Sequence, residues 1–449
     1  MAKQRMQAGL SLGPSFAELC AINSSGEVLF QSRAYLPKEP LRELFRRWAI
    51  ETEGYELTQL NISNRALEKI FATRLGGSVA QIVTAGFETW PWLRQPMSED
   101  YFSMSATRTE PLASQELIFG ITERVSAEGK LLKAVDLEPL QFISAKLKLM
   151  NVQKVCLNLL FSHLNPVNEE KAKAYFREEG FEVFCRTRLE KSTDEVTAWR
   201  TNILNACLSG TFLEMEREIR ESLKTAYPVT DAINIRYVNS AGCLEETPLQ
   251  NISGILFGWS GLIKSDTPVL HLGLEKWSWV EPENCNRWQS PWGSVEVPHK
   301  DFKSLPVQPT CLLEKDLYQE ISWGDEATFE PGPMSFGRSQ RPLLVDFLLH
   351  TLPPAKESFS HLTSAQGESR FTQSLHLLEK TSSTRNLAAE IFDGSLRLSL
   401  LNNSSNTVKL SGYWAEILMP SYKMKFPSLQ FELLSSHPYE EALNAAKLN

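Results

Sequence analysis

The sequence lacks closely spaced cysteines, long apolar runs and any of the common nucleophile or P-loop motifs. Its seven cysteines are scattered over 449 residues without a Cys-x-x-Cys pair, which argues against a disulfide framework or a zinc ribbon and fits a reducing cytoplasm. The longest apolar run, near 155–161, is too short to cross a bilayer, and the interrupted N-terminal stretch makes a poor signal peptide. We therefore expect a cytoplasmic protein with no metal site and no membrane contact.

No stretch of the chain carries charge of one sign. The 46 basic and 54 acidic residues give a formal net charge of -8 and are interspersed, so nothing supplies the positive surface that nucleic acid or an anionic membrane requires. With 42% hydrophobic residues, a chain of this length can bury a large core and divide into two or three domains. This composition favours small-molecule or protein partners over nucleic acid.

Periodicity predicts strands and helices that alternate along the chain. In the first part, strands are predicted at 7–12, 16–22 and 27–35, helices at 40–51 and 64–73, and a buried strand at 79–84. Helix and strand then alternate at 140–150, 155–161, 168–178 and 181–185, before a long helix over 193–227 and a strand over 233–238. Such alternation is typical of sheets covered by helices.

The second half is less regular. The Trp- and Pro-rich segment 276–323 predicts strands and loops, and the Ser-rich stretch 353–370 predicts an exposed loop. From 387 to 443 strand and helix alternate again. We expect a domain boundary near residue 190, just before the long helix.

Several short blocks stand in a fixed order along the chain: Thr84-Ala85-Gly86-Phe87-Glu88 with Arg94-Gln95, Glu123 to Gly129, Ser162 to Glu169, Asn202 to Ala206, Asn239 to Gly242, and Gly324 to Arg338 followed by Asp346. In sequence and in order these blocks resemble those of hydantoinase A and oxoprolinase proteins. The resemblance covers essentially the whole chain, which is shorter than usual family members. It implies an α/β, two-lobed, actin-like (ribonuclease H-like) ATPase-type fold with mixed sheets flanked by helices. Residues 1–190 would form the N-terminal-like domain and residues 191–449 the second domain.

The resemblance also implies a chemistry. In working members ATP activates an amide or carbonyl oxygen by phosphorylation, after which a ring is opened or a carboxylate is transferred, usually with a hydantoinase B-type partner. Such a site needs glycines that let backbone N–H groups approach phosphates, and an Asp that holds magnesium.

The first phosphate loop of the family, Asp-x-Gly-Gly-Thr, resembles Ser11-Leu12-Gly13-Pro14-Ser15 here. The carboxylate is missing, and Pro14 lacks the N–H that a second glycine would offer. A simple tight turn between two strands is the plainer interpretation.

The second loop corresponds to His271-Leu272-Gly273-Leu274-Glu275, where only the glycine remains. Glu275 can replace a carboxylate and His271 can act as a base near neutral pH; the alternative is a buried, satisfied histidine and a glutamate on the rim. Asp346 is a third candidate for such a remodelled catalytic cluster, with a surface role as its alternative.

Other glycine loops of the family are also degraded. They correspond to 257–261, 305–310 and 411–414, so the degenerate cleft positions are Ser11, Gly13, Pro14, Gly258, Gly273 and Gly412. Tryptophans stand at or near several of these places and either plug the old cleft or form a docking patch. We interpret Asn64, Asn165, Asn205 and Arg338, which match the family, as residues that maintain the fold.

Two functional hypotheses follow. The first is a pseudo-enzyme that has lost its ATP site, holds neither ATP nor magnesium as a cofactor, and acts as a scaffold for a protein or ligand. The alternative is a subunit of a hydantoinase, oxoprolinase or carboxylase-like enzyme that hydrolyses or carboxylates a small cyclic amide or ketone, with His271, Glu275 or Asp346 in its catalytic cluster. Either hypothesis predicts a protein partner, a hydantoinase B-type subunit or a second copy of the chain.

Overall fold

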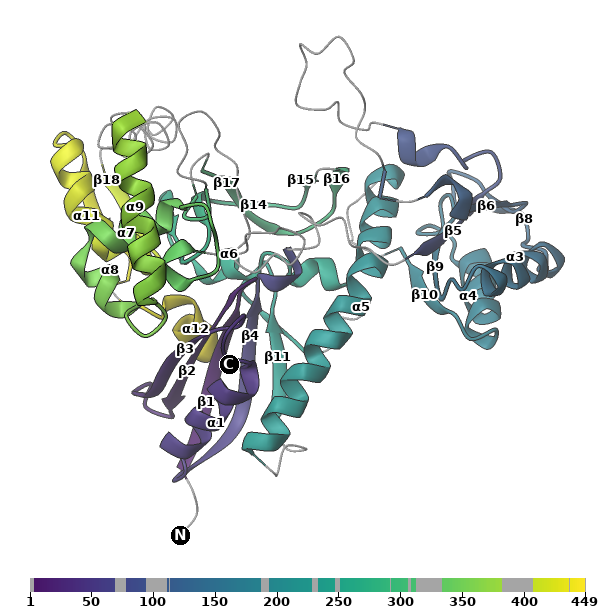
Figure 1. Ribbon diagram of the computed structural model, residues 1–449. Coiled ribbons are helices and arrows are strands. Elements are labelled where there is room, and N and C mark those ends of the chain that lie inside the picture. The colour runs from purple at the N-terminus through teal and green to yellow at the C-terminus, as the bar shows by residue number, and fades with distance from the viewer. Residues whose placement is uncertain are drawn as a thin grey trace.

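The computed structural model is a mixed α/β protein organised around three sheets (Figure 1). It describes residues 4–68, 78–93, 111–112, 114–186, 194–227, 233–246, 251–290, 292–305, 308–311, 333–381, 407–435 and 437–448. Within these ranges lie one six-stranded, one four-stranded and one five-stranded sheet, with two short two-stranded ribbons, β7–β8 (Arg124–Val125 and Leu131–Lys133) and β15–β16 (Trp288–Ser290 and Gly293–Val295).

The six-stranded sheet has the order β12-β11-β4-β1-β2-β3. Its strands are β1 (Gln4–Leu12), β2 (Phe16–Asn23), β3 (Val28–Tyr35), β4 (Tyr55–Asn64), β11 (Asn234–Val238) and β12 (Leu244–Glu245). β1, β2 and β3 pair antiparallel, whereas β4 runs parallel to β1 and β11 runs parallel to β4.

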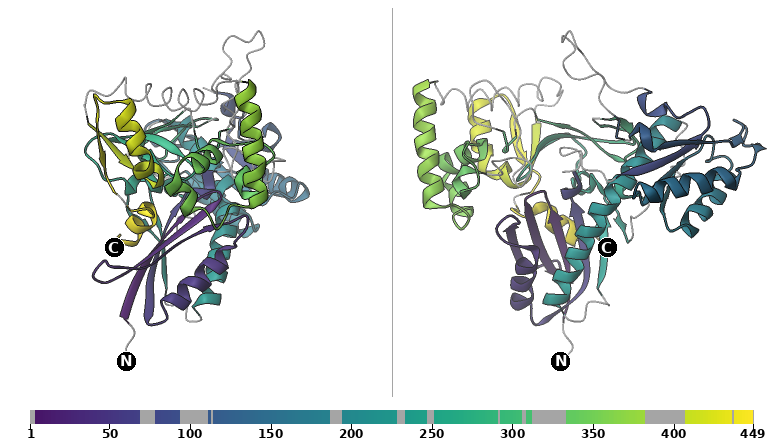
Figure 2. Two further views of the ribbon diagram at one scale, coloured as in Figure 1. Left: turned by 60° about the vertical axis from the view of Figure 1, so that its left-hand side comes forward. Right: turned by 45° about the vertical axis from the view of Figure 1, so that its right-hand side comes forward.

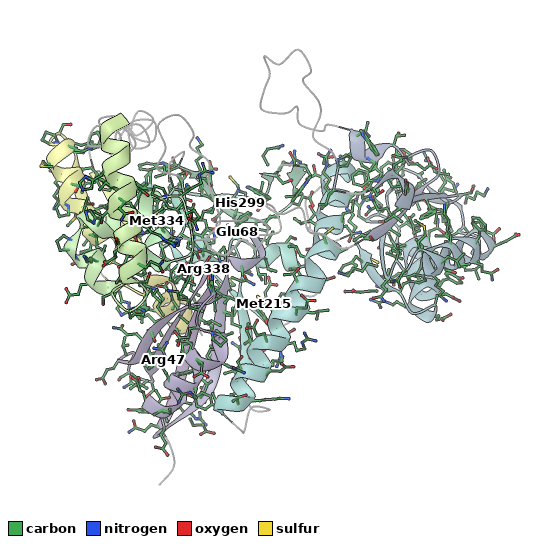
Figure 3. All side chains as sticks on the ribbon, in the orientation of Figure 1. Arg47, Glu68, Met215, His299, Met334 and Arg338 are labelled. Carbon is green, nitrogen blue, oxygen red and sulfur yellow. The ribbon has the colours of Figure 1, made fainter. Side chains whose placement is uncertain are left out.

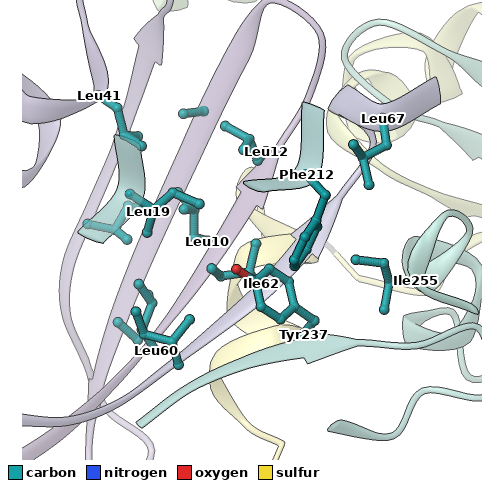
Figure 4. Close-up of a cluster of buried hydrophobic side chains, with 14 of the residues drawn as sticks. Leu10, Leu12, Leu19, Leu41, Leu60, Ile62, Leu67, Phe212, Tyr237 and Ile255 are labelled. Atoms are coloured by element: carbon teal, nitrogen blue, oxygen red, sulfur yellow. The ribbon is translucent and has the colours of Figure 1, made fainter. Parts of the chain in front are cut away.

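Both faces of this sheet are covered, because alternate residues of each strand point to opposite sides. On one face α1 (Leu41–Glu51) and the C-terminal half of α5 (Glu195–Ala226) bury a core that includes Leu10, Leu60 and Phe212 (Figure 4). The other face of the sheet is covered by α12 (Glu440–Ala446), the last helix of the described residues (Figure 2). Gly9 faces α12 so closely that a Cβ there would lie 1.9 Å from the carbonyl oxygen of Ala442.

The five-stranded sheet repeats this topology. Its order is β17-β14-β13-β18-β19, formed by β13 (Val269–Leu272), β14 (Trp277–Cys285), β17 (His299–Ser304), β18 (Thr407–Ser411) and β19 (Gln430–Leu433). β13, β14 and β17 pair antiparallel, and β18 and β19 continue parallel from β13. β13 therefore occupies the place that β1 holds in the first sheet, and the β13–β14 turn is the counterpart of the β1–β2 turn.

Helices surround this second sheet in the left-hand part of Figure 1. They are α7 (Leu344–Thr351), α8 (Pro353–Ser358), α9 (Ala365–Thr381) and α11 (Tyr413–Lys425). Their core contains Trp277, Trp414 and Phe359. The short helix α6 (Gly258–Leu262) packs against β11, β4 and β17 and so lies between the two sheets.

The four-stranded sheet is entirely parallel, with the order β10-β9-β5-β6. It consists of β5 (Val79–Thr84), β6 (Ile118–Ile121), β9 (Lys154–Asn158) and β10 (Glu182–Cys185), and α3 (Leu137–Leu149) and α4 (Val167–Glu178) cover one face. The N-terminal half of α5 covers the other face with Trp199, Ile203 and Cys207. α5 thus joins this part of the molecule to the first sheet, as Figure 1 shows.

Most predicted elements are present, but two predictions were wrong. The segment 64–73 does not begin a helix: Asn64 ends strand β4, a short 3-10 helix follows at Ala66–Glu68, and 69–73 lie outside the described residues. The Ser-rich stretch 353–370 is not a loop but contains α8 and the start of α9, because Ala355 and Phe359 are buried in the core of the second sheet.

The boundary expected near residue 190 lies outside the described residues, which resume at 194. Strands from both sides of it share the first sheet, since β11 pairs with β4. In the described part of the chain, no helix combines the length and apolar character needed to cross a membrane.

Candidate functional site

Two equivalent hairpin turns, one from each mixed sheet, face each other. The β1–β2 turn is closed by a hydrogen bond of 2.8 Å from the Gly13 N–H to the Phe16 carbonyl, so the tight-turn interpretation of Gly13–Pro14–Ser15 describes its geometry. From the β13–β14 turn, the Glu275 carboxylate accepts a long hydrogen bond of 3.4 Å from the Ser15 N–H. A Cβ on Gly13 would lie 2.5 Å from the same Glu275 oxygen. The Glu275 side chain therefore fills the space between the two turns.

Beside these turns lies a cavity of about 50 Å³. Most of the predicted cleft positions line it: Ser11, Gly13, Pro14, His271, Gly273, Glu275 and Gly412. Pockets for drug-sized ligands usually have volumes of roughly 300–1,000 Å³, so this space is far smaller than a nucleotide site and has room for a few water molecules.

The lining of the cavity is acidic. Five carboxylates line it, from Glu18, Glu68, Glu275, Glu440 and Glu441, whereas the cationic groups in the lining are Arg65 and Lys276. A phosphate chain carries several negative charges and is held in proteins by backbone N–H groups, cations and bound metal. This lining has the opposite electrostatic character.

Arg65, which directly follows strand β4, connects the acidic residues to His271. One guanidinium nitrogen lies 2.9 Å from His271 Nε2 and 3.2 Å from Glu441 Oε2, and the guanidinium lies 4.2 Å from the centre of the Trp259 ring. This arrangement places a buried cation between a histidine, a carboxylate and an aromatic face. Figure 3 shows Glu68, from the same segment, near the centre of the molecule.

His271 is held as a neutral ring. Because Arg65 can only donate, Nε2 accepts from it, and the proton resides on Nδ1, 2.9 Å from the Ser411 hydroxyl. Trp259 stacks on the ring with centroids 5.3 Å apart. Burial and the positive charge of Arg65 hold the pKa of His271 well below its usual value. Its basic lone pair is occupied, so the buried, satisfied interpretation fits better than that of a general base.

Burial also raises the pKa of three carboxyl groups of the cavity to about 7, those of Glu68, Glu275 and Glu440. Each has a neutral hydrogen-bond donor: Trp259 Nε1 donates to Glu68 over 3.2 Å, and the Gly412 N–H donates to Glu440 over 2.8 Å. Near neutral pH a substantial share of these groups holds a proton, which lowers the repulsion among the five carboxylates.

Gly412 is required by the backbone rather than by a ligand. Its φ is +88°, and a Cβ there would lie 2.6 Å from the carbonyl of Leu272. β18 therefore ends in a conformation that favours glycine. The Gly412 N–H donates to the Glu440 carboxylate.

Two predicted residues do not line the cavity. Gly258 begins α6, where a Cβ would lie 2.2 Å from the Val238 carbonyl oxygen, so this glycine permits close contact between a helix and a strand. Asp346 is fully buried at the start of α7 and accepts hydrogen bonds from the N–H groups of Met334, Ser335 and Leu343 and from the Ser335 hydroxyl. Its carboxylate is thus occupied in fixing the segment that contains Arg338.

Among the described tryptophans, one covers the cavity, as the plugging hypothesis predicts, and others belong to a hydrophobic core, which neither hypothesis predicted. Trp259 covers the cavity residues His271 and Arg65. Trp277 and Trp414 belong to the core of the second sheet, where Trp414 Nε1 donates to the Leu274 carbonyl over 3.2 Å. Trp92 is 37% exposed, and Trp323 lies outside the described residues.

The family asparagines bond to backbone, as residues that maintain a fold do. Asn205 accepts from the Ser253 N–H over 2.7 Å, and Asn165 donates to the Gly129 carbonyl over 2.9 Å. Arg94, Gln95 and residues 324–332, which also carry the resemblance, lie outside the described residues. Among the residues that the structure places, no group of three or more His, Cys, Asp or Glu side chains could hold a metal ion.

Sequence reasoning found Glu275 but missed Arg65 and the other four carboxylates, Glu18, Glu68, Glu440 and Glu441. Glu440 and Glu441 belong to a seven-residue helix at the far end of the chain, and no motif connects them to Gly13 or His271. Arg65 directly follows strand β4 and so lies at the end of a strand, where sites commonly form, but the prediction of a helix from residue 64 hid this position.

Comparison with known proteins agrees with the resemblance. The model of the hydantoinase/oxoprolinase N-terminal region matches residues 61–180. An uncharacterized protein of Methanocaldococcus jannaschii is 23% identical over 233 residues, which are 49% of this chain and 33% of that protein. The chain therefore matches about a third of the length of this curated relative.

Two solved structures share the fold over nearly all of the chain. The ATP-dependent caprolactamase from Pseudomonas jessenii aligns with a TM-score of 0.66 and 14% identity over 98% of this chain and 70% of that chain. A nucleotide-free acetone carboxylase aligns with a TM-score of 0.65 and 12% identity over 100% and 70%. The match of the N-terminal-region model over residues 61–180 and the shared fold of these two structures support the resemblance of the chain to the hydantoinase/oxoprolinase family.

Proposed function

We propose that this chain is a pseudo-enzyme of the hydantoinase/oxoprolinase family, a scaffold that binds a protein or ligand and no longer binds ATP. The single observation that carries the proposal is the position of Glu275. Its carboxylate lies between the two turns, in contact with Ser15 and beside Gly13, where the resemblance would place phosphates. Together with Pro14 and four further carboxylates, it leaves a small acidic cavity.

The proposal includes an actin-like arrangement of two lobes. It is supported by the shared strand order and directions of the two mixed sheets and by their equivalent turns. A division of the chain near residue 190, into 1–190 and 191–449, remains part of this proposal. So does a cytoplasmic location, which fits seven cysteines that are all free.

The alternative, an enzyme subunit with a remodelled catalytic cluster, has less support. His271 has its lone pair occupied by Arg65, and Asp346 lies in the core with four donors around it. Of these three candidates, Glu275 is the one that lines the cavity with a pKa raised toward neutrality. The solved relatives are described as ATP-dependent, so ATP binding is the property that separates the two hypotheses.

Thermal unfolding with and without Mg-ATP tests the proposal. A ligand present at about 100 times its dissociation constant stabilises the folded state by about 2.7 kcal/mol, which corresponds to an increase of about 3 °C in Tm for a chain of this length. We expect no change in Tm with Mg-ATP or Mg-ADP.

A dose-dependent increase that requires both magnesium and the triphosphate would refute the loss of the ATP site. The same experiment with the variant Pro14→Gly is a sharper test of the proposal, because glycine restores one backbone N–H in the turn. We expect it to remain unresponsive, since the Glu275 carboxylate still occupies the space between the turns.

A further inference from the structure

A buried arginine lies where the two mixed sheets meet. Arg33 belongs to β3, the edge strand of the six-stranded sheet, and is only 7% exposed. Its Nε donates to Glu18 Oε1 on the neighbouring strand β2 over 2.7 Å, and its Nη2 pairs with the same oxygen. A buried charge lowers stability unless it is paired and hydrogen-bonded. The ion pair with Glu18 therefore anchors Arg33 to its own sheet.

Three aromatic rings from outside the six-stranded sheet surround the guanidinium group. The ring of Tyr413, the first residue of α11, has its centre 4.6 Å from Arg33 Cζ, and the ring of Phe359, directly after α8, has its centre at 5.4 Å. Tyr439, directly before α12, lies at 5.0 Å, and the adjoining Pro438 carbonyl accepts from Nη2 over 3.3 Å. Cation–π contacts are strongest when they are desolvated, as these are. Arg33 thus binds elements of both sheets at once.

Beside the arginine, one hydrophobic core continues from the first sheet into the second. Phe16 at the start of β2 and Tyr35 at the end of β3 belong to the same buried cluster as the helices around the five-stranded sheet. The ring centres of Phe16 and Phe359 are 6.2 Å apart, and those of Tyr35 and Phe336 are 5.4 Å apart, both in edge-to-face geometry. Separating the sheets here would expose these four rings to water.

The cluster around Arg33 also forms part of the wall of the acidic cavity. Three of its members, Glu18, Tyr413 and Pro438, line that cavity. Every contact of the cluster is supplied by side chains and backbone of the chain itself. The junction between the sheets is therefore closed beside the cavity by contacts that need no bound molecule.

We propose that Arg33 is a clasp that holds the two mixed sheets in one closed arrangement without a bound nucleotide. Opening the junction would leave the guanidinium paired with Glu18 alone and would remove its three aromatic neighbours, so the closed arrangement is favoured. The clasp also fixes the segment that leads from β19 to α12, through Pro438 and Tyr439. This inference goes beyond the proposed function, and it does not depend on whether the chain binds ATP.

Pulsed electron spin resonance between two spin labels tests the inference. Labels on p-acetylphenylalanine in place of Ile50 and Met424 avoid the native cysteines, and these side chains, on α1 and α11, are 62% and 77% exposed. Without nucleotide, the protein with native Arg33 should show a single distance. Arg33→Met keeps an apolar side chain but loses the charge. It should add a population at longer distance, about tenfold or more above that of the wild type, because desolvated cation–π contacts are lost.

Matched variants separate the clasp from a general loss of stability. Arg186 is an equally buried arginine (6% exposed) that pairs with Glu195 over 2.7 Å, beside the parallel sheet. Arg186→Met should lower Tm and leave the label distance unchanged. Tyr413→Leu/Tyr439→Leu removes two rings and retains the ion pair of Arg33, and it should open the junction. Tyr439→Phe retains the ring and should stay closed.

Circular dichroism and Tm establish which variants are folded. The inference is overturned if the protein with native Arg33 already populates two distances, or if folded Arg33→Met or folded Tyr413→Leu/Tyr439→Leu keeps the wild-type distance. If Arg33→Met does not fold, the double tyrosine variant decides. The Mg-ATP experiment remains separate: an open wild type removes only the clasp, and a Tm response to Mg-ATP removes only the pseudo-enzyme proposal.

Discussion

Replacing Glu275 with glutamine removes a titrating proton from the space between the two turns and leaves its shape almost unchanged. The amide oxygen can still accept from the Ser15 N–H. In the wild type, burial raises the pKa of Glu275 from 4.5 to about 7. That difference corresponds to on the order of 3 kcal/mol between the protonated and ionised states.

The sign of the effect follows from proton binding. Below pH 4.5 the Glu275 carboxyl is protonated in both the folded and the unfolded protein, so its burial does not lower stability. Between pH 4.5 and 7 the unfolded chain releases the proton while the folded chain keeps it, so stability falls as pH rises. Above pH 7 the full cost of a buried carboxylate is present. Glu275→Gln avoids this cost, and its advantage should be largest near pH 8.

Urea unfolding at pH 5 and pH 8 measures the effect. We expect the variant to gain stability relative to the wild type between these two pH values, by up to about 3 kcal/mol. The control Glu53→Gln changes an exposed side chain and should show no such gain. If Glu275→Gln loses stability at pH 8, the carboxylate is a favourable charge in its place, and the account of a buried, largely neutral group between the turns is wrong.

Two further variants test the scaffold around the cavity. Asp346→Ala leaves four buried donors without their acceptor and should lower the free energy of unfolding by about 3–5 kcal/mol. Asp266→Ala, at a site exposed by 87%, should change it little. Urea midpoints compare the two variants, and equal effects would contradict the assigned role of Asp346. Gly412→Ala should lower stability by at least about 1–3 kcal/mol because of its positive φ and its contact with Leu272. Gly54→Ala, whose new Cβ would meet nothing within 4 Å, should change stability little. Thermal unfolding compares the two variants, and a Gly412→Ala protein as stable as the wild type would refute the backbone argument.

The local elements of the fold were predictable wherever periodicity and turn residues agree. The strand predicted at 79–84 is β5, and the helix predicted over 193–227 is α5. The Ser-rich stretch 353–370 misled because its many polar residues outweigh the apolar positions Ala355, Phe359 and Leu362, which are buried at a helical spacing. Hydrophobic pattern alone cannot separate a short polar helix from a loop.

The sequence predicted that the two phosphate loops are degraded, but not which residues occupy their place. The sequence indicates that His271 and Gly13 belong to two degraded loops, because each loop is contiguous. It does not indicate what fills the space, since Arg65 and Glu68 follow β4 whereas Glu440 belongs to α12, and only the folded topology brings these distant segments together. Nor does the type of residue decide its role: Asp346 looks like a catalytic acid in sequence and acts as a support for the backbone of Met334 and Ser335.

The placement of α12 has a consequence for how the molecule can be divided. This last helix follows β19 of the five-stranded sheet, yet it packs on β1 and β2 of the six-stranded one, where Asn61 donates to the Ala445 carbonyl over 2.8 Å. The first sheet is therefore covered in part by a segment that follows the five-stranded sheet in the chain. That face can close only after residues 440–446 have been synthesised, and a fragment that stops before 440 would leave Gly9 and its neighbours exposed, which favours aggregation.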